Sequence, residues 1–430
     1  MVGVAPVLWR PMSTSTNAPT MAELGARAKA ASRVLALVGT AAKDTALRAA
    51  ADLLIARREH ILAANARDVA TAESTGATAT QLDRLRLSES KLQSMADGLR
   101  QVASLPDPVG EITEGFTRPN GLQISKVRVP LGVVAIIYEN RPNVTSDAAG
   151  LCVKAGNAAF LRGSGGAIES NKAITSALRD AMEQAGLPAD AVILVEDTRH
   201  EAAVEFMRQR DSIDCLIPRG GPSLIRSILE NATVPYVIDG EGNCHVYVDA
   251  TADLDMALDI VVNAKTQRPS VCNAAESLLV HASVADTFLP RVDAALTQVE
   301  LIGDERTCAR IARAGVATDL DYATEFLDLK LSVRVVDSLD DAIAHIQRFG
   351  SGHSEAIVTT DVRASDRFLL AVDAAAVLVN ASTRFVDGSE FGLGAEIGIS
   401  TQKLHARGPM GLRALTTEKF IVRGTGQTRP

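Results

Sequence analysis

A regular alternation of short apolar runs with amphipathic segments constrains the fold most. After an apolar run that ends at residue 138, further runs typical of buried strands occupy residues 158–163, 191–196, 214–218 and 234–239. The stretches between them, such as Ser170–Gly186 and His200–Arg210, carry apolar residues at helical spacing. Strands that alternate with short helices predict a parallel, doubly wound sheet, and such a sheet binds ligands at the carboxyl ends of its strands.

The same alternation resumes further along the chain. Strand-like runs lie near residues 245–251, 277–281, 331–337, 355–360 and 375–380, with helical segments between them. The sequence therefore predicts a second α/β domain. At 430 residues, the chain is also long for one hydrophobic core. Residues 21–105 are rich in alanine and leucine at helical spacing, whereas residues 118–131 and the tail near 414–426 predict exposed strands that pair with each other.

Composition narrows the class of protein. A net charge of −8 and a pI near 5.5 argue against a nucleic-acid surface, and no apolar run reaches membrane-spanning length. The five cysteines lie far apart without a C-x-x-C pair, and the histidines show no ligand spacing. We therefore expect a cytoplasmic protein with no metal site, no membrane contact and no nucleic acid. Residues 1–20 predict a disordered tail rather than a signal peptide.

Two glycine-containing loops each follow a predicted strand and precede a predicted helix. The first, Arg162–Asn171 (RGSGGAIESN), departs from G-x-G-x-x-G because Ile168 stands at the third glycine position. The second is Pro218–Ser223 (PRGGPS), where Gly220 and Gly221 would let the backbone approach a ligand closely. Either loop alone is equally well explained as a turn, but two of them on one sheet favour a nucleotide.

Two further segments carry residues with catalytic potential. Asn140 follows an apolar strand within YENRPN, where its amide could donate to an oxyanion, although the segment is also ordinary turn chemistry. Cys272 lies in QRPSVCNAAE, close in sequence to Lys265 and Arg268. A nucleophilic cysteine needs cationic neighbours or a helix N-terminus, and sequence proximity alone does not supply them. On local pattern alone, core packing remains the favoured interpretation of Cys272.

Taken together and in order, these segments resemble the aldehyde dehydrogenase superfamily. Within it the chain is most similar to the γ-glutamyl phosphate reductases, through five stretches spread over residues 21–426. The stretches are VPLGVVAIIYENRPNVTSDAAGLCVKAGNAAFLRGS, QRPSVCNAAE, HIQRFGSGHSEAI, DGSEFGLGAEIGIST and RGPMGLRALTTEKFIVRG. The resemblance implies a Rossmann-type cofactor domain over residues 21–239 with a return segment near 387–407. It also implies a catalytic domain over 240–386 and an oligomerisation arm from 118–131 and 408–430.

The resemblance also implies roles for single residues. Cys272 matches the family's catalytic thiol, and Asn140 matches the asparagine that completes the oxyanion hole with the Cys272 backbone N–H. Arg162 stands where many members have a lysine near the adenosine ribose, and an arginine there suits the 2′-phosphate of NADPH. Glu325 matches the glutamate that holds the nicotinamide ribose. The loop residues expected to contact the cofactor are Gly163, Ser164, Gly220, Gly221 and Ser223.

One departure from the family pattern bears on the reaction. Oxidising members carry a glutamate base that activates a water molecule for deacylation, but here Asp239 occupies that position and Glu241 is displaced. Because an enzyme that releases its acyl group to phosphate needs no such base, the departure favours an acyl-phosphate reductase. The expected reaction is NADPH-dependent reduction of L-glutamyl 5-phosphate to L-glutamate 5-semialdehyde through a Cys272 thioester, the second step of proline biosynthesis.

Charged residues are expected to bind the substrate. The candidates for its anionic groups are Arg141, Lys154, Arg268, Arg384 and Arg407, and those for its ammonium are Asp387, Glu390 and Glu396. A homodimer or higher homo-oligomer is expected through the arm, and glutamate 5-kinase is a candidate partner because the acyl phosphate is labile. Three alternatives stay open: an acylating dehydrogenase that uses coenzyme A, a cysteine hydrolase or acyltransferase, and a non-enzymatic binding protein.

Overall fold

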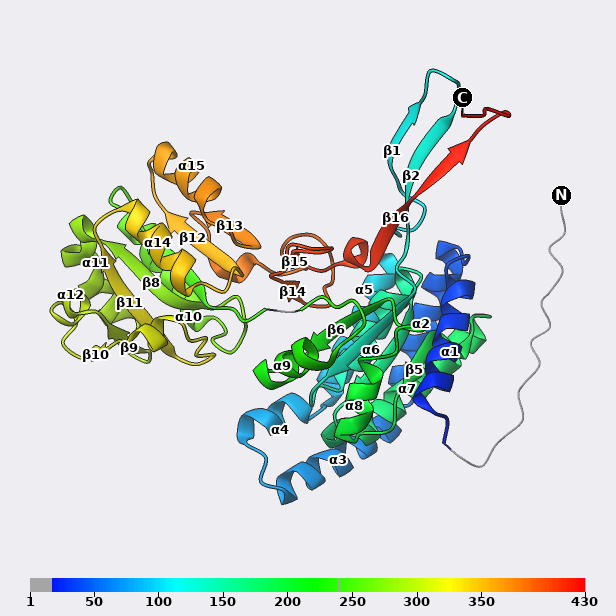
Figure 1. The fold of residues 1–430 in the computed structure, drawn as a ribbon. Coiled ribbons are helices and arrows are strands. Elements are labelled where there is room, and N and C mark those ends of the chain that lie inside the picture. The colour runs from blue at the N-terminus through cyan, green and yellow to red at the C-terminus, as the bar shows by residue number, and fades with distance from the viewer. Residues whose placement is uncertain (1–17, 239, 430) are drawn as a thin grey trace.

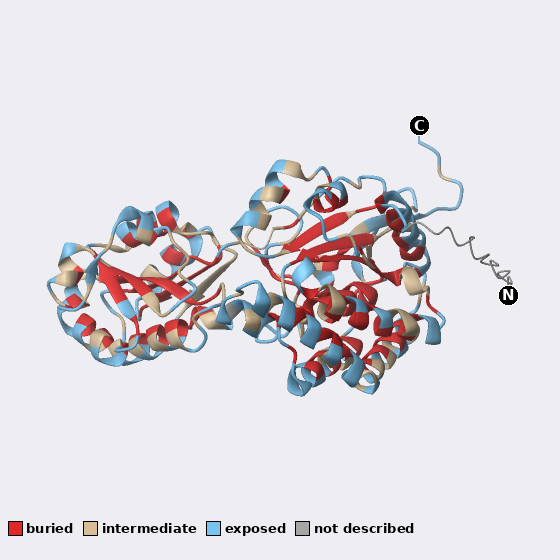
Figure 2. Cartoon of the chain, turned by 90° about the horizontal axis from the view of Figure 1, so that it is seen from below, coloured by how far each residue is buried: buried red, intermediate tan, exposed pale blue. Residues whose placement is uncertain are grey.

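The computed structural model describes residues 18–238 and 240–429, which form two α/β lobes and a projecting arm (Figure 1). Residues 1–17 of the predicted disordered tail and Asp239 lie outside the described residues. In both lobes the central strands of the sheet are buried and the outer surfaces of the helices are exposed (Figure 2). Within the described ranges, no helix is long and apolar enough to cross a bilayer.

The first lobe is built on a parallel sheet with the strand order β5-β4-β3-β6. Its strands are β3 (Val133–Tyr138), β4 (Ala158–Gly163), β5 (Val192–Leu194) and β6 (Cys215–Arg219). Every residue of β3 and β4 is buried, as continuous apolar runs predict for the centre of a parallel sheet. Since the chain runs from β3 to β5 in one direction and then returns to β6 on the other side, the strand order reverses between β3 and β6.

Helices cover this sheet. They are α1 (Met21–Leu35), α2 (Thr40–Ala56), α3 (Arg58–Ser74), α4 (Ala79–Leu85), α5 (Glu89–Ser104), α6 (Asn143–Lys154), α7 (Ile168–Gln184), α8 (His200–Phe206) and α9 (Pro222–Asn231), with 3₁₀ turns at Gly165–Ala167 and Ala189–Ala191. Thr20 accepts a hydrogen bond from the Glu23 N–H and closes a capping box, which explains why α1 begins at Met21.

The second lobe has a seven-stranded sheet with the order β10-β9-β11-β8-β7-β12-β13, and its described pairs are all parallel. The strands are β7 (Cys244–Val248), β8 (Ala275–His281), β9 (Glu300–Gly303), β10 (Gly315–Val316), β11 (Lys330–Val336), β12 (Ser354–Val358) and β13 (Ala376–Val379). The helices are α10 (Leu254–Thr266), α11 (Ala282–Ala295), α12 (Glu305–Cys308), α13 (Asp319–Tyr322), α14 (Leu339–Phe349) and α15 (Val362–Ala371). Successive residues of β7 belong to different apolar clusters: Val246 packs with α10 and α11, and Tyr247 packs with α14 and α15. Both faces of the sheet are therefore covered.

The arm consists of three antiparallel strands in the order β1-β2-β16. These are β1 (Ile112–Thr117), β2 (Gln123–Pro130) and β16 (Thr416–Arg423), so the predicted pairing of the tail with the hairpin is confirmed. The hairpin begins earlier than the predicted range 118–131, because residues 118–122 form its turn, with Gly121 at a φ of +87°.

Two described segments connect the lobes, residues 240–243 and the stretch after β13. The second carries β14 (Ile399–Ser400), β15 (Gly408–Pro409) and 3₁₀ turns at Thr383–Phe385 and Leu412–Leu415, and buries Ile397 and Met410 in the core of the first lobe. The predicted strand 234–239 is wrong: Tyr236 makes only an isolated bridge to Leu216. Pro235 lacks the N–H that a continued ladder would need.

Candidate active site

Cys272 lies in the loop between α10 and β8, and it is only partly buried. Cys152, Cys215 and Cys244 are buried, and burial raises the pKa of each of these thiols. Partial exposure separates Cys272 from these three cysteines, because a buried thiol with a raised pKa is a poor nucleophile.

A buried ion pair closes the base of the loop that carries Cys272. Lys265, in the last turn of α10, has its Nζ 2.6 Å from Oε2 of Glu276 in β8, and both side chains are fully buried. The other carboxylate oxygen of Glu276 accepts a hydrogen bond from the Leu327 N–H at 3.1 Å. Burial raises the pKa of Glu276, and Lys265 opposes that shift. The pair therefore holds the two ends of the loop at a fixed separation.

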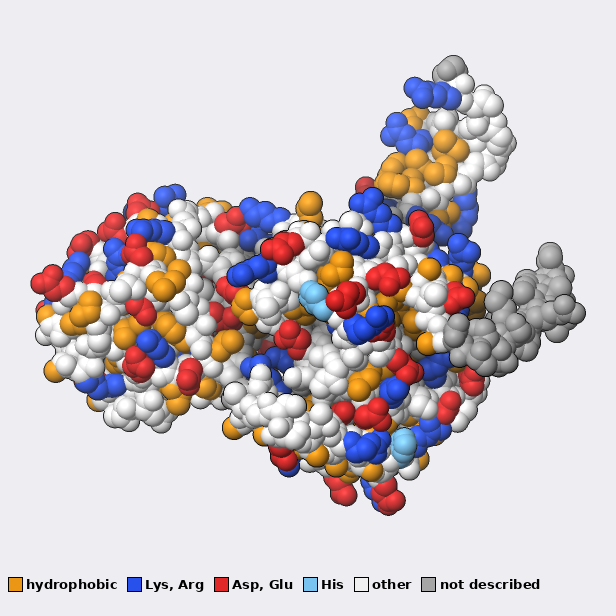
Figure 3. All heavy atoms as spheres, turned by 60° about the horizontal axis from the view of Figure 1, so that its bottom comes forward, with side chains coloured by type: hydrophobic (Ala, Val, Ile, Leu, Met, Phe, Trp, Pro, Cys, Tyr) orange, Lys and Arg blue, Asp and Glu red, His pale blue; other side chains and the backbone are white. Residues whose placement is uncertain are grey.

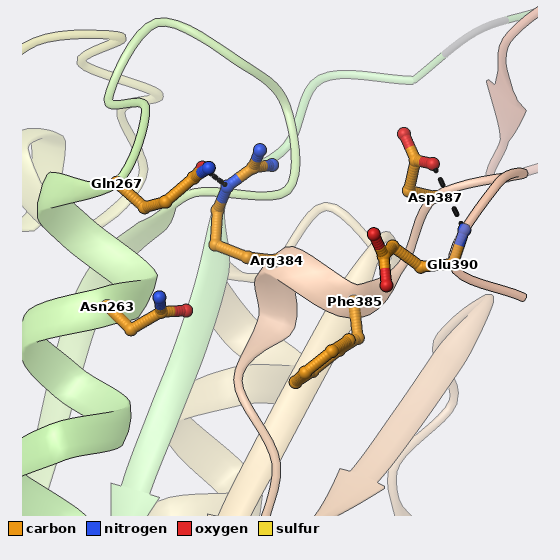
Figure 4. A pocket seen from close by; sticks show the side chains of 6 residues that line it. All are labelled: Asn263, Gln267, Arg384, Phe385, Asp387 and Glu390. Carbon is orange, nitrogen blue, oxygen red and sulfur yellow. Dashed lines mark hydrogen bonds between the residues drawn. The ribbon is translucent and has the colours of Figure 1, made fainter.

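A recess of about 250 Å³ opens beside this loop (Figure 4). It is lined by Asn263, Gln267, Arg384, Phe385, Asp387 and Glu390. The Nε of Arg384 donates a hydrogen bond to Oε1 of Gln267 at 2.9 Å. This bond holds the guanidinium near the end of α10, the helix that precedes Cys272. Basic and acidic side chains therefore share one small cavity.

The charge of the Arg384 guanidinium also interacts with that of Cys272. Burial and the neighbouring Arg268 lower the pKa of Arg384, whereas charge on Asp387 and on Cys272 raises it. By reciprocity, Arg384 favours the thiolate form of Cys272. Electrostatic interactions thus link Arg384 to Arg268 and to Cys272, three of the residues singled out from the sequence.

In the first lobe, Asn140 stands at the end of β3 with a φ of +32°. Its Oδ1 accepts a hydrogen bond from the Ser164 hydroxyl at 2.6 Å, and its N–H donates to the same hydroxyl at 3.0 Å. A side chain on Gly166 would place its Cβ 2.7 Å from Oδ1 of Asn140. The first glycine loop therefore packs directly against the predicted oxyanion residue. Asn140 and Cys272 come from different lobes (Figure 1).

The second glycine loop follows β6, beside the point where the strand order reverses. Gly221, the N-cap of α9, donates its N–H to Oε2 of Glu139 at 3.1 Å. A Cβ on Gly220 would lie 2.8 Å from the carboxylate carbon of Glu139. Ligands bind doubly wound sheets at such a crevice. Ser223 follows in the first turn of α9. Glu139 thus shapes this loop, although sequence reasoning assigned it no role.

Arg162 ends up largely buried at the end of β4, 8% exposed. One terminal nitrogen donates to the backbone carbonyls of Thr198 and Arg199 at 3.1 and 2.9 Å. Its Nε is buried without a hydrogen-bond partner. Gly163 continues β4 and packs against Asn171. The predicted cofactor loop therefore contains an unsatisfied cationic donor.

Glu325 lies in the second lobe, where one carboxylate oxygen accepts a hydrogen bond from the Gly242 N–H at 2.8 Å. Gly242 in turn contacts the backbone of Cys272, because a Cβ on Gly242 would lie 1.6 Å from the Cys272 carbonyl oxygen. Glu325, which is predicted to bind the nicotinamide ribose, is therefore connected to the Cys272 loop through Gly242.

The prediction that Lys154 binds substrate is wrong. Its side chain is fully buried in the first lobe, with Nζ 2.5 Å from Asp44 and 2.9 Å from the carbonyl oxygen of Ala103. Arg407 is paired with Asp373 at 2.8 Å. Glu396 accepts a hydrogen bond from the Gly388 N–H at 2.9 Å and supports the segment that carries Asp387 and Glu390. Arg141 is partly buried next to Asn140.

Comparison with known proteins assigns the family. The family model for the aldehyde dehydrogenase family matches residues 12–311. The chain belongs to the aldehyde dehydrogenase family. A γ-glutamyl phosphate reductase of Moorella thermoacetica is 60% identical over 407 residues, 94% of this chain and 97% of that protein. The one of Heliobacterium modesticaldum is 56% identical over 94% and 98% of the two chains.

Solved structures of the same family agree. The crystal structure of a γ-glutamyl phosphate reductase from Thermotoga maritima has a TM-score of 0.94 and 45% identity, covering 95% of this chain and all of that one. An acetylating aldehyde dehydrogenase from Geobacillus thermoglucosidasius has a TM-score of 0.68 at 17% identity, covering 95% and 97%, and shows the shared fold. The predicted fold class, an α/β protein of the aldehyde dehydrogenase type, is therefore confirmed.

Sequence reasoning missed several residues that the fold places at the Cys272 loop. Gln267 and Asn263 line the recess, Gly242 and Cys244 lie against the Cys272 backbone, and Glu276 pairs with Lys265. Asn263, Gln267 and Cys272 form the pattern N-x₃-Q-x₄-C, so the sequence contained the signal of the first two. The contacts of residues 242–244 carried no local signal, because they arise only when β7 and β8 pair.

Proposed function

We propose that the chain is an NADPH-dependent γ-glutamyl phosphate reductase, which converts L-glutamyl 5-phosphate to L-glutamate 5-semialdehyde and phosphate in the second step of proline biosynthesis. The observation that carries the proposal is a partly exposed Cys272 that interacts electrostatically with Arg384, a residue lining a recess together with the acidic Asp387 and Glu390. The names of relatives that match over almost the whole chain support the same substrate.

Cys272 is the nucleophile of this proposal. Its thiolate attacks the acyl carbon, the C–S bond forms, and the bond to the phosphate oxygen breaks, so that phosphate leaves and a thioester remains. Asn140 and the Cys272 backbone N–H stabilise the oxyanion of each tetrahedral species, and one such donor is typically worth about 2.7–4 kcal/mol. Since Asn140 belongs to the other lobe, the two lobes must be oriented so that it faces Cys272.

The recess supplies complementary charges for the rest of the substrate. Arg384 and Arg268 bind an anionic group, and Asp387 and Glu390 bind the α-ammonium. Arg141 and Glu396 are second candidates for these two roles. An Arg384→Gln variant is expected to raise the KM for the acyl phosphate, because Gln267 would lose its charged partner and the recess its cation.

NADPH is the proposed cofactor, and the residues of the first lobe fit its phosphates. The buried Nε of Arg162 lacks a partner, and the adjacent Ser164, Gly165 and Gly166 form a loop of small residues. When bound, the cofactor supplies the hydride that reduces the thioester. Arg162 binds its 2′-phosphate, Gly220, Gly221 and Ser223 face its diphosphate, and Glu325 binds its nicotinamide ribose.

Cofactor choice is testable with a matched pair of variants. Arg162→Ala is expected to lower kcat/KM for NADPH more than for NADH. Arg179→Ala is the control, because Arg179 also donates to a backbone carbonyl of this lobe, that of Val192 at 2.8 Å. An unchanged cofactor preference in Arg162→Ala contradicts the assignment.

The arm is the proposed site of self-association. It exposes Ile112, Phe116, Phe420 and Val422, and Figure 3 shows apolar side chains gathered on it. Acidic and basic side chains are interspersed over both lobes on that face. Among the described residues, the outer strands of the arm, β1 and β16, each pair on one side only, so we expect a homodimer or higher oligomer. The free cysteines are consistent with a cytoplasmic enzyme. Glutamate 5-kinase is the expected supplier of the labile acyl phosphate.

A reverse assay tests the reaction class. The purified chain is mixed with glutamate 5-semialdehyde and NADP⁺, and NADPH formation is followed with phosphate, with coenzyme A, or with neither. Sustained turnover is expected only with phosphate. Turnover that requires coenzyme A would favour the alternative acylating dehydrogenase, and turnover with neither would favour release to water.

A further inference from the structure

A second cysteine lies directly behind the proposed nucleophile. Cys244, the first residue of β7, is fully buried, and its Sγ is 3.1 Å from the backbone carbonyl oxygen of Cys272. This is hydrogen-bond distance for a thiol donor. The reaction described above gives Cys244 no role.

The strand pairing explains this placement. Strands β7 and β8 are parallel neighbours, and Cys244 is paired with Ala275, three residues after Cys272. The register shifts between Cys244 and His245, so Cys244 falls outside the regular alternation of the strand. Its side chain is thereby placed under the end of the loop rather than in either apolar face of the sheet.

The surroundings keep the Cys244 thiol protonated. Burial raises its pKa well above the usual value, and the nearby Glu355 carboxylate adds to the shift. His353 lies 3.7 Å from Sγ through its Nδ1, and burial lowers the pKa of this imidazole to about 4, so it is neutral. A neutral thiol next to a neutral imidazole can donate its S–H to the carbonyl oxygen.

Two other contacts hold the same stretch of backbone. Gly242 packs against it without a side chain, and a Cβ there would meet the carbonyl carbon of Cys272 at 2.3 Å. The Asn273 side chain donates from Nδ2 to the carbonyl oxygen of Val386 at 2.9 Å. Gly242, the Asn273 side chain and Cys244 thus hold the peptide between Cys272 and Asn273 from three sides, and Cys244 supplies a side-chain donor to its carbonyl oxygen.

We infer that Cys244 is a positioning residue for Cys272. Its S–H holds the Cys272 carbonyl, fixes the rotation about the Cα–C bond of Cys272, and so directs Sγ toward the recess that contains Arg384. The inference deepens the proposed function and rests on Cys272 being the nucleophile. Fixing a reacting group in advance lowers the barrier of the step that it performs.

Three variants test this role. Cys244→Ala removes the donor, Cys244→Ser replaces it with a hydroxyl, and Cys152→Ala is the control that removes a buried thiol from the other lobe. Because a neutral hydrogen bond is worth little net, Cys244→Ala is expected to lower kcat about three- to tenfold with KM within about twofold. Cys244→Ser is expected to recover most of the loss, and Cys152→Ala to retain the wild-type kcat.

Alkylation of Cys272 by iodoacetamide, followed by peptide mass spectrometry, gives a readout independent of reductase activity. In Cys244→Ala the midpoint of its pH profile is expected to rise, because Sγ is no longer held beside Arg384, and in Cys244→Ser to return. If Cys244→Ala is too unstable to assay, Cys244→Val fills the space without a donor. Wild-type alkylation in the donorless variant, or no recovery in a folded Cys244→Ser, overturns the inference. Loss of turnover in every form with the expected alkylation shifts would instead count against the proposed reaction.

Discussion

Removing one partner of the buried Lys265–Glu276 pair is expected to destabilise the second lobe strongly. In Lys265→Met the Glu276 carboxylate loses a cation 2.6 Å away while it stays fully buried. Breaking such a pair typically costs about 3–5 kcal/mol, because the remaining charge is uncompensated. The double variant Lys265→Met, Glu276→Met removes both charges and leaves only the Leu327 N–H without its acceptor, a loss of about 1 kcal/mol.

The cost should depend on pH with a defined sign. Burial already raises the folded-state pKa of Glu276 from 4.5 to about 7 although Lys265 opposes the shift, so in Lys265→Met we expect the folded state to bind the proton still more tightly than the unfolded state. The variant therefore regains stability as pH falls from the folded pKa toward 4.5, at up to about 1.4 kcal/mol per pH unit. The double variant has no such dependence.

The measurement is urea unfolding followed by circular dichroism, with hydrogen exchange of peptides from β8 to assign the loss to the second lobe. Regional exchange is needed because two lobes need not unfold as one unit. A single variant that loses less than about 1 kcal/mol, or a double variant as unstable as the single one, would refute the reasoning.

Three further outcomes are expected. Lys154→Met should lower the free energy of unfolding by about 1–3 kcal/mol, because the buried ion pair with Asp44 is lost. The KM for the acyl phosphate should stay unchanged. A raised KM in a variant of full stability would show that Lys154 binds substrate. Burial lowers the pKa of His353 to about 4, below its unfolded value of 6.5. The stability that the neutral imidazole contributes is therefore fully present above pH 6.5 and is lost as pH falls toward 4. The free energy of unfolding should therefore drop by about 3 kcal/mol more in the wild type than in His353→Gln over that range, and equal slopes would contradict it. Phe116→Ser combined with Phe420→Ser should weaken self-association in sedimentation velocity, and a wild type that is monomeric at micromolar concentration would contradict the role of the arm.

The sequence predicted those parts of the fold that local pattern controls. The continuous apolar runs at β3 and β4 and the helical spacing of α7 correspond to real elements, because both strands are buried on two faces and the helix on one. The prediction of a strand over residues 234–239 was wrong because Pro235 interrupts the ladder. The proline was visible in the sequence, but the apolar residues around it were given more weight.

Long-range contacts could not be predicted from the sequence. Nothing near Lys154 indicates that Asp44, 110 positions earlier in the chain, neutralises it, so a basic residue in a family motif was taken for a ligand. The placement of Cys244 and Gly242 against Cys272 depends on the pairing of β7 with β8. The identity of Cys272 as a candidate came from the order of several motifs, and only the fold showed that it interacts electrostatically with Arg384.

Trapping the acyl group on Cys272 tests the central claim most directly. The chain is incubated with glutamate 5-semialdehyde and NADP⁺ in the absence of phosphate, and its intact mass and peptides are then measured. We expect one glutamyl group per chain, located on Cys272, which disappears when phosphate is added and never forms in Cys272→Ala. A Cys272→Ala variant that retains full turnover, or an adduct at another residue, would contradict it.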